Sequence, residues 1–157
     1  MERSQSMSII IKEILAEQTR EIRQTVLRQG LPAATTIFKG DELETTFHLG
    51  AFEKNKLVGI ATYLFKNKSA IQELFSDEKF MYQLRGMAVM ENEQGKGIGK
   101  KLVEFAECRL KEDQIDVLWF HARTSAVPFY EKQGYQTVGE ELDLEPAGPH
   151  FKMYKEL

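Results

Sequence analysis

Three glycines within five residues make one short segment of this chain suited to holding a phosphate. The segment reads Gln94-Gly95-Lys96-Gly97-Ile98-Gly99-Lys100 and lies between a predicted strand and a predicted helix. The free N–H groups and the dipole of a helix N-terminus favour an anion, and glycines let a phosphate approach the backbone closely. Lys96 and Lys100 add positive charge. We therefore predict a phosphate-binding loop, although a plain loop-to-helix turn would have the same sequence pattern.

Individual residues of this segment exclude two common types of nucleotide-binding loop. A Walker A loop requires Ser or Thr after its Gly-Lys pair, but Lys101 follows Lys100, and Gly95 is one residue too close. The dinucleotide fingerprint requires a glycine where Lys100 stands. The pattern that remains is Gln-x-x-Gly-x-Gly, at Gln94, Gly97 and Gly99.

The elements around this loop follow from hydrophobic patterning. Predicted strands cover residues 8–15, 45–53, 56–66, 81–90, 115–121, 135–141 and 150–155. Predicted helices cover residues 16–29 and 125–133, and a third begins at Ile98 with one apolar face. Gly86 interrupts its strand and indicates a bulge or a close backbone approach. We predict one mixed α/β domain over residues 1–157, with residues 1–7 weakly ordered.

Composition narrows the classes of partner. The 157 residues carry 21 Lys and Arg against 24 Asp and Glu, a net charge of -3, which argues against a nucleic-acid or membrane-surface partner. The single cysteine, Cys108, excludes an internal disulfide and a CxxC metal or redox site, and we expect a buried, inert thiol there. No apolar run approaches the roughly 18 residues of a membrane span, and the N-terminus has no secretory pattern. A cytoplasmic protein without a metal site is expected.

A second block supports a specific interpretation of the glycine loop. Gln-x-x-Gly-x-Gly between a strand and a helix resembles the coenzyme A signature of the GNAT superfamily of N-acetyltransferases. Residues 126–135, AVPFYEKQGY, resemble the A-x-x-F-Y-x-x-x-G-F/Y segment of the same superfamily at the expected distance downstream. The order of elements also follows the superfamily's plan from about residue 8 onward. The resemblance implies an α/β fold (an α+β mixed sheet), the GNAT acyl-CoA N-acyltransferase fold, with a central, mostly antiparallel sheet flanked by helices.

The resemblance also implies a reaction and its parts. An acetyl group would pass from acetyl-CoA, as cosubstrate, to a primary amine of a small-molecule or peptide acceptor within a ternary complex. Tyr130 stands where many members have the general acid for the CoA thiolate, whereas a half-buried structural tyrosine is the alternative. We expect Phe129 to anchor that segment in the core. The implied acetyl-CoA contacts are Met87, Ala88, Val89, Gln94, Gly95, Lys96, Gly97, Ile98, Gly99, Lys100, His121 and Phe129.

The acceptor side departs from the family pattern. Gln83 stands where some relatives have a glutamate as general base, and an amide cannot take a proton. His150 is the best alternative base, although a satisfied strand histidine fits its position equally well. His121 stands where asparagine is frequent and would keep a CoA or backbone contact, or titrate near neutrality. Arg85 would contact the acceptor or make an ordinary ion pair.

Two other functions stay open on the sequence. The missing carboxylate at position 83 is compatible with a CoA-binding module without turnover. An acyltransferase that uses a longer acyl-CoA is the other alternative. Many family members form dimers, so a homodimer is expected by analogy alone.

Overall fold

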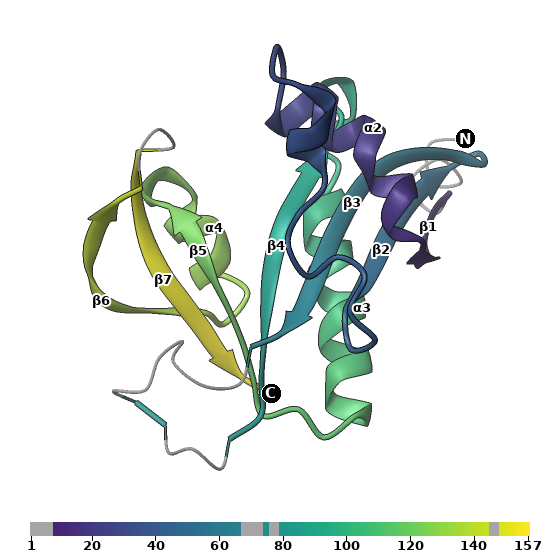
Figure 1. Cartoon of the computed structure of the whole chain (residues 1–157). Coiled ribbons are helices and arrows are strands. Elements are labelled where there is room, and N and C mark those ends of the chain that lie inside the picture. The colour runs from purple at the N-terminus through teal and green to yellow at the C-terminus, as the bar shows by residue number, and fades with distance from the viewer. Residues whose placement is uncertain (1–7, 67–73, 76–78, 145–147) are drawn as a thin grey trace. The chain divides into compact units, whose positions relative to one another are not determined.

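The computed structural model describes residues 8–66, 74–75, 79–144 and 148–157. The chain groups into two compact units, one formed by Met1–Leu64 with Leu84–Cys108 and the other by Phe65–Gln83 with Arg109–Leu157. Figure 1 shows the elements of both units. The weak order expected for residues 1–7 concerns residues outside the described ranges.

The first unit contains an antiparallel sheet whose strands follow one another in the chain. Strand β1 (Ile9–Ile14) pairs with β2 (Phe47–Glu53), and β2 pairs with β3 (Lys56–Phe65), all antiparallel. The β2–β3 turn places Lys54 and Asn55 at φ 51° and 71°, a left-handed pair that a two-residue hairpin turn requires. The strands predicted over residues 45–53 and 56–66 are therefore confirmed, and they form a hairpin.

The predicted helix over residues 16–29 is helical but is not one regular α-helix. A 3-10 turn over Ala16–Thr19 leads into α2 (Arg20–Ile22), and a π-helical turn follows over Arg23–Leu27 (Figure 1). The spacing of Ile22, Val26 and Leu27 suggested a simple amphipathic helix. It did not indicate that Arg23 is fully buried in this stretch and reaches polar partners on other elements.

Helix α3 (Ile98–Glu112) buries one face, as predicted. Ile98, Leu102 and Ala106 are almost completely buried, whereas Phe105 at the margin of that face is 41% exposed. Cys108 is exposed, so the buried thiol expected from the sequence is wrong. A helix turns by roughly 100° per residue, which carries Cys108 to the side opposite the buried stripe.

The second unit holds the remaining strands. The beginning of β4 (Met81–Val89) pairs in parallel with β5 (Val117–Arg123), β5 pairs antiparallel with β7 (Pro149–Glu156), and β7 pairs antiparallel with β6 (Gln136–Asp143). Helix α4 (Val127–Glu131) lies between β5 and β6 in the sequence. The hydrogen-bonded order is β1-β2-β3-β4-β5-β7-β6. This mixed, mostly antiparallel sheet confirms the predicted fold class.

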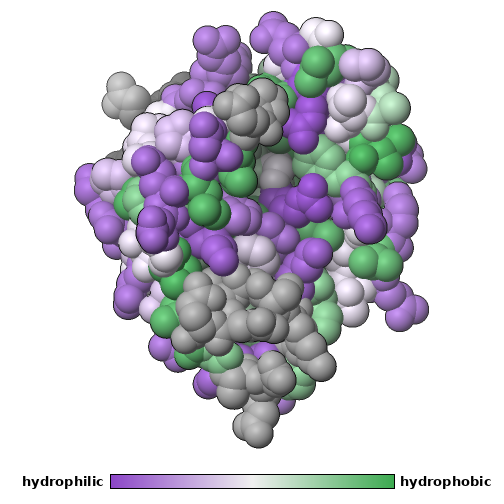
Figure 2. Space-filling view, turned by 60° about the vertical axis from the view of Figure 1, so that its left-hand side comes forward, coloured by the Kyte–Doolittle hydropathy of each residue, from purple (hydrophilic) through white to green (hydrophobic). Residues whose placement is uncertain are grey.

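The surface is mainly hydrophilic with interspersed apolar side chains. Figure 2 shows hydrophobic residues as separate patches among hydrophilic ones on the face it presents. In the described part of the chain, no helix is both long and apolar enough to cross a membrane.

Candidate active site

Between two backbone hydrogen bonds that join β3 and β4, the chain of β4 contains one residue more than that of β3. The Lys66 N–H donates to the Met81 carbonyl at 3.0 Å, and the Met90 N–H donates to the Val58 carbonyl at 2.9 Å. Eight steps along β3 therefore match nine steps along β4. Gly86 lies within this stretch at φ +62°, the left-handed conformation typical of bulge glycines. A Cβ there would lie 2.7 Å from Phe38 Cε2. The bulge and the close approach to the backbone that were expected at Gly86 are therefore both present.

The pairing between β4 and β5 covers only the first third of β4. The last pair joins Gln83 to Trp119. Within the first unit, Leu84–Val89 have β3 on one edge and no strand on the other edge among the described residues. Backbone N–H and C=O groups on an unpaired strand edge can accept another extended chain. The backbone of Met87, Ala88 and Val89 is therefore suited to pairing with an extended ligand, as the resemblance implies.

The glycine loop follows β4 after one 3-10 turn, Glu91–Glu93, and has an open backbone. Gly95 and Gly97 adopt φ values of +85° and +79°, and a Cβ at either position would meet no protein atom within 4 Å. The first N–H of the α3 ladder is that of Lys101, which donates to the Gly97 carbonyl at 3.1 Å, so the preceding amides have no partner within the helix. Gln94 Nε2 donates to the Val89 carbonyl at 3.1 Å and ties the loop to β4. The loop thus fits an anionic group such as a pyrophosphate.

The side chains of the loop differ in what they offer. Ile98 is 2% exposed and would contact a Cβ placed at Gly59, so only its backbone is available to a ligand. Lys96 Nζ binds Glu93 Oε1 at 2.8 Å and lies 3.7 Å from Glu53 Oε2. The hydrogen bond to Glu93 raises the pKa of Lys96, which keeps the ammonium charged. Lys100 has no ion-pair partner among the described residues and is the freer cation.

Substituting Gly97 by Val should weaken acetyl-CoA binding about 10- to 100-fold, because the new side chain would fill the space in which a pyrophosphate meets the loop amides. A left-handed backbone is also strained by any Cβ, so strain must be measured separately. Gly30 is a matched control, since it has the same φ of +79° and nothing within 4 Å of an added Cβ. Both variants should show a similar drop in Tm, and only Gly97→Val should lose affinity in calorimetry. Equal acetyl-CoA affinity in the two variants would contradict the phosphate-binding assignment.

Tyr130 lies on the short helix α4 and packs into an aromatic group of the second unit. Its ring centroid is 4.5 Å from that of Phe120, 5.0 Å from Phe129 and 6.2 Å from Tyr135. Burial raises the pKa of Tyr130 to about 12, so the phenol stays protonated at neutral pH. Phe129 is 45% exposed, so the expectation that Phe129 anchors this segment in the core is wrong. Successive residues of a helix point in different directions, and here Tyr130 is the one that faces β5.

The two candidate histidines have different environments within the second unit. His121 is exposed, its ring lies edge-on to Trp119 at 5.6 Å, and partial burial with Lys152 and His150 lowers its pKa. His150 is 8% exposed, and its Nδ1 lies 2.7 Å from the Gly148 carbonyl. Because a carbonyl only accepts, Nδ1 carries the proton, and Nε2 is the free acceptor of the neutral ring. Both the structural and the catalytic interpretation of His150 are compatible with this contact.

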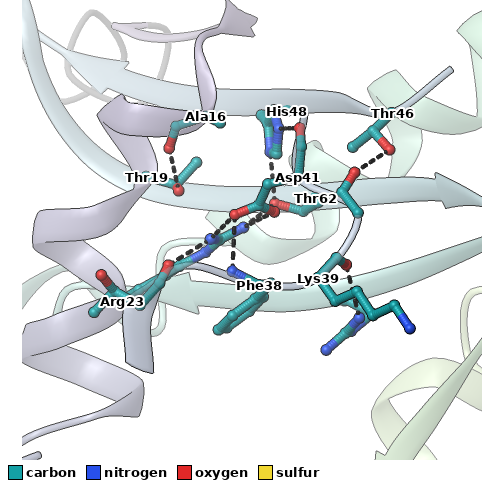
Figure 3. Close-up of polar contacts among 12 residues, drawn as sticks. Ala16, Thr19, Arg23, Phe38, Lys39, Asp41, Thr46, His48 and Thr62 are labelled. Atoms are coloured by element: carbon teal, nitrogen blue, oxygen red, sulfur yellow. Dashed lines mark hydrogen bonds and ion pairs between the residues drawn. The ribbon is translucent and has the colours of Figure 1, made fainter. Parts of the chain in front are cut away.

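A buried polar network in the first unit was not foreseen from the sequence. Arg23 donates to both carboxylate oxygens of Asp41 at 2.6 and 3.0 Å, to the Thr36 carbonyl at 2.7 Å and to Thr62 Oγ1 at 2.7 Å. His48 Nδ1 lies 2.8 Å from the same Thr62 hydroxyl, as Figure 3 shows. Burial would raise the pKa of Asp41, but the Arg23 guanidinium and the Phe38 N–H outweigh it and hold that pKa below 3.8. These side chains stabilise each other inside the unit.

Arg85 forms no ion pair among the described residues. The ordinary ion pair that was one of the two expected roles of Arg85 is therefore absent from this part of the chain. Its Nη1 lies 3.5 Å from the Lys39 carbonyl, and its guanidinium carbon lies 5.3 Å from the centre of the Phe38 ring. Phe38 thus joins Arg85 to the bulge at Gly86. Sequence reasoning missed Phe38 because its partners are distant in the chain.

The sequence-predicted residues therefore fall into two groups. The first unit brings together Arg85, Met87–Val89 and Gln94–Lys100. The second unit contains Gln83, His121, Phe129, Tyr130 and His150. Among the residues with described positions, no cluster of three or more His, Cys, Asp or Glu side chains could hold a metal ion.

Comparisons with known proteins agree with this architecture. A family model described as an acetyltransferase (GNAT) domain matches residues 32–157. The protein named uncharacterized N-acetyltransferase YitI of Bacillus subtilis is 33% identical over 147 residues, which are 94% of this chain and 95% of that protein. The crystal structure of Escherichia coli ElaA has a TM-score of 0.72 at 17% identity, with 94% of this chain and 99% of that chain covered. Arabidopsis thaliana NAA60, solved in complex with acetyl-CoA, has a TM-score of 0.75 at 13% identity, with 95% and 98% covered.

Proposed function

This chain belongs to the GNAT family of acetyltransferases, and on that premise we propose that it transfers the acetyl group of acetyl-CoA to a primary amine by direct attack in a ternary complex. The observation that carries the proposal is the end of β4. Its pairing with β5 ends at Gln83, and within the first unit Leu84–Val89 have β3 on one edge and no strand on the other among the described residues, before the chain enters the open glycine loop. One continuous stretch of backbone thereby offers an edge for pantetheine and amides for the pyrophosphate.

Each part of the reaction has a candidate group. Backbone N–H groups of Met87–Val89 would polarise the thioester carbonyl, because fixed donors stabilise the charge that develops on its oxygen. The amine nitrogen bonds to the acetyl carbon while the carbon–sulfur bond breaks, and the products are an amide and the CoA thiol. Tyr130 would donate the proton that the thiolate takes up. Its hydroxyl has no hydrogen-bond partner among the described residues.

The acceptor nitrogen must also lose a proton. Gln83 cannot accept it, and the neutral His150 ring presents Nε2 as an acceptor. We assign His150 or a water chain to this step, whereas His121 is proposed to contact CoA. The acceptor would be a small-molecule or peptide amine.

Release of CoA thiol from acetyl-CoA over a broad panel of primary amines tests the proposal. We expect amine-dependent thiol release together with the matching acetylated product by mass spectrometry. Tight acetyl-CoA binding with no amine-dependent release across the panel would instead support a CoA-binding module. Faster release from longer thioesters than from acetyl-CoA would replace the acetyl donor by another acyl-CoA.

A further inference from the structure

Three arginines of the first unit surround one aromatic ring. The guanidinium carbons of Arg23, Arg28 and Arg85 lie 3.8, 5.0 and 5.3 Å from the centre of the Phe38 ring. Phe38 itself is 8% exposed, so much of its surface is covered by this group and by the backbone at Gly86. A ring face attracts cations, but like charges around the same ring repel one another.

Within the described ranges, a carboxylate neutralises only one of these three positive charges. Asp41 holds Arg23 through two hydrogen bonds. Among the described residues, the other two each contact a single backbone carbonyl, that of Leu27 at 3.1 Å for Arg28 and that of Lys39 at 3.5 Å for Arg85. A guanidinium has five N–H donors, so most donors of Arg28 and Arg85 have no protein acceptor among the described residues.

The energetic cost of this arrangement points to a ligand. Arg28 and Arg85 are both partly buried near the same ring, and two charges without a carboxylate partner lose solvation without gaining a counterion. Burial and the neighbouring Arg23 and Arg28 lower the pKa of Arg85, whereas Asp41 opposes that effect. An anion bound by both guanidinium groups would offset the repulsion between their charges and accept hydrogen bonds from the N–H donors that have no protein acceptor.

We infer that Arg28 and Arg85 bind an anionic group of the acceptor, so that the amine acetylated by this protein carries a carboxylate or a phosphate. The inference rests on the proposed transfer to an amine. Arg85 precedes Met87 by two residues on β4, with the bulge at Gly86 between them. An anion held by Arg85 would therefore leave a nearby amine of the same molecule close to the backbone that polarises the thioester.

Matched pairs of amines test the inference, with rates expressed per unprotonated amine. An amino acid is compared with its amide, and phosphoethanolamine with ethanolamine, which separates the two sources of anion. We expect the charged member of at least one pair to have the lower KM. Arg85→Gln and Arg28→Gln should raise that KM about 10- to 100-fold and leave the KM of the neutral partner unchanged. Arg85→Lys should recover part of the loss, because it restores charge without the planar fork.

Lys39→Gln is the matched control, because it removes an exposed positive charge from the residue whose carbonyl contacts Arg85. It should leave both KM values unchanged. Equal use of charged and neutral amines would overturn the anion site while leaving acetyl transfer intact. If no amine is acetylated, calorimetry with the amino acid and with inorganic phosphate decides: binding that Arg28→Gln/Arg85→Gln abolishes supports the site, and absence of binding to the unmodified protein refutes it.

Discussion

Replacing Tyr130 by Phe is expected to lower kcat about 10²- to 10⁴-fold, the usual contribution of a positioned general acid. The substitution removes one oxygen and keeps the ring that packs on Phe120. Stability and acetyl-CoA affinity should therefore stay nearly unchanged. Steady-state kinetics with a good amine acceptor, together with calorimetric titration of acetyl-CoA, measure the two quantities separately.

A control substitution in the second unit separates the loss of a catalytic proton donor from the loss of any phenolic hydroxyl. The half-buried Tyr154 donates to Gln136 Oε1 at 3.2 Å, so Tyr154→Phe also removes a phenolic hydroxyl. It should leave kcat unchanged. Since the pKa of Tyr130 is raised to about 12, ionisation of this phenol should not limit the rate near neutral pH. Unchanged turnover in Tyr130→Phe would remove the residue from the mechanism.

Replacing Asp41 by Asn should lower the free energy of unfolding by about 3–5 kcal/mol, because it leaves the guanidinium of Arg23 buried without a counterion. Both side chains are essentially inaccessible, at 0% and 1% exposure. Glu42→Gln is the matched control, since it neutralises the adjacent, exposed carboxylate. That change should stay within about 0.5 kcal/mol in urea titrations. Similar stability of the two variants would contradict the structural role of the pair.

The pH dependence of stability provides an independent measurement of the same pair. The folded pKa of Asp41 lies below its ordinary value of 3.8, so its contribution is complete above the unfolded pKa and is lost as the pH falls through the folded one. The unmodified protein should therefore lose stability on acidification below about pH 4 more steeply than Asp41→Asn. Parallel curves for the two proteins would show that Asp41 is not held in its charged form by Arg23.

Several elements were predictable because short-range sequence determines them. The hairpin depends on Lys54 and Asn55 in its turn, and the amphipathic pattern places the buried stripe of α3. The loop glycines and the start of α3 follow from residues next to each other in the chain. Two family-like blocks in the right order were therefore enough to identify the fold class.

Burial within a short helix was less predictable. Tyr130 and Phe129 are adjacent aromatic residues, and either could face the core. The ring of Phe120, on β5, lies 4.5 Å from the ring of Tyr130, and no residue near Tyr130 in the sequence indicates this contact. Which ring is buried depends on how α4 is oriented against its neighbouring strand, and the hydrophobicity of the two residues does not predict that orientation.

The sequence by itself determined the glycine loop, the order of elements and the family, because those depend on local conformation and on motif spacing. Only the tertiary structure decided which residues of β4 pair with β5, and that Arg23 binds Asp41, 18 residues away. It also decided that Arg28 and Arg85 lie near the Phe38 ring, which packs against Gly86. These features depend on contacts between segments far apart in the chain. Their energies come from burial and charge pairing, which exist only once the chain has folded.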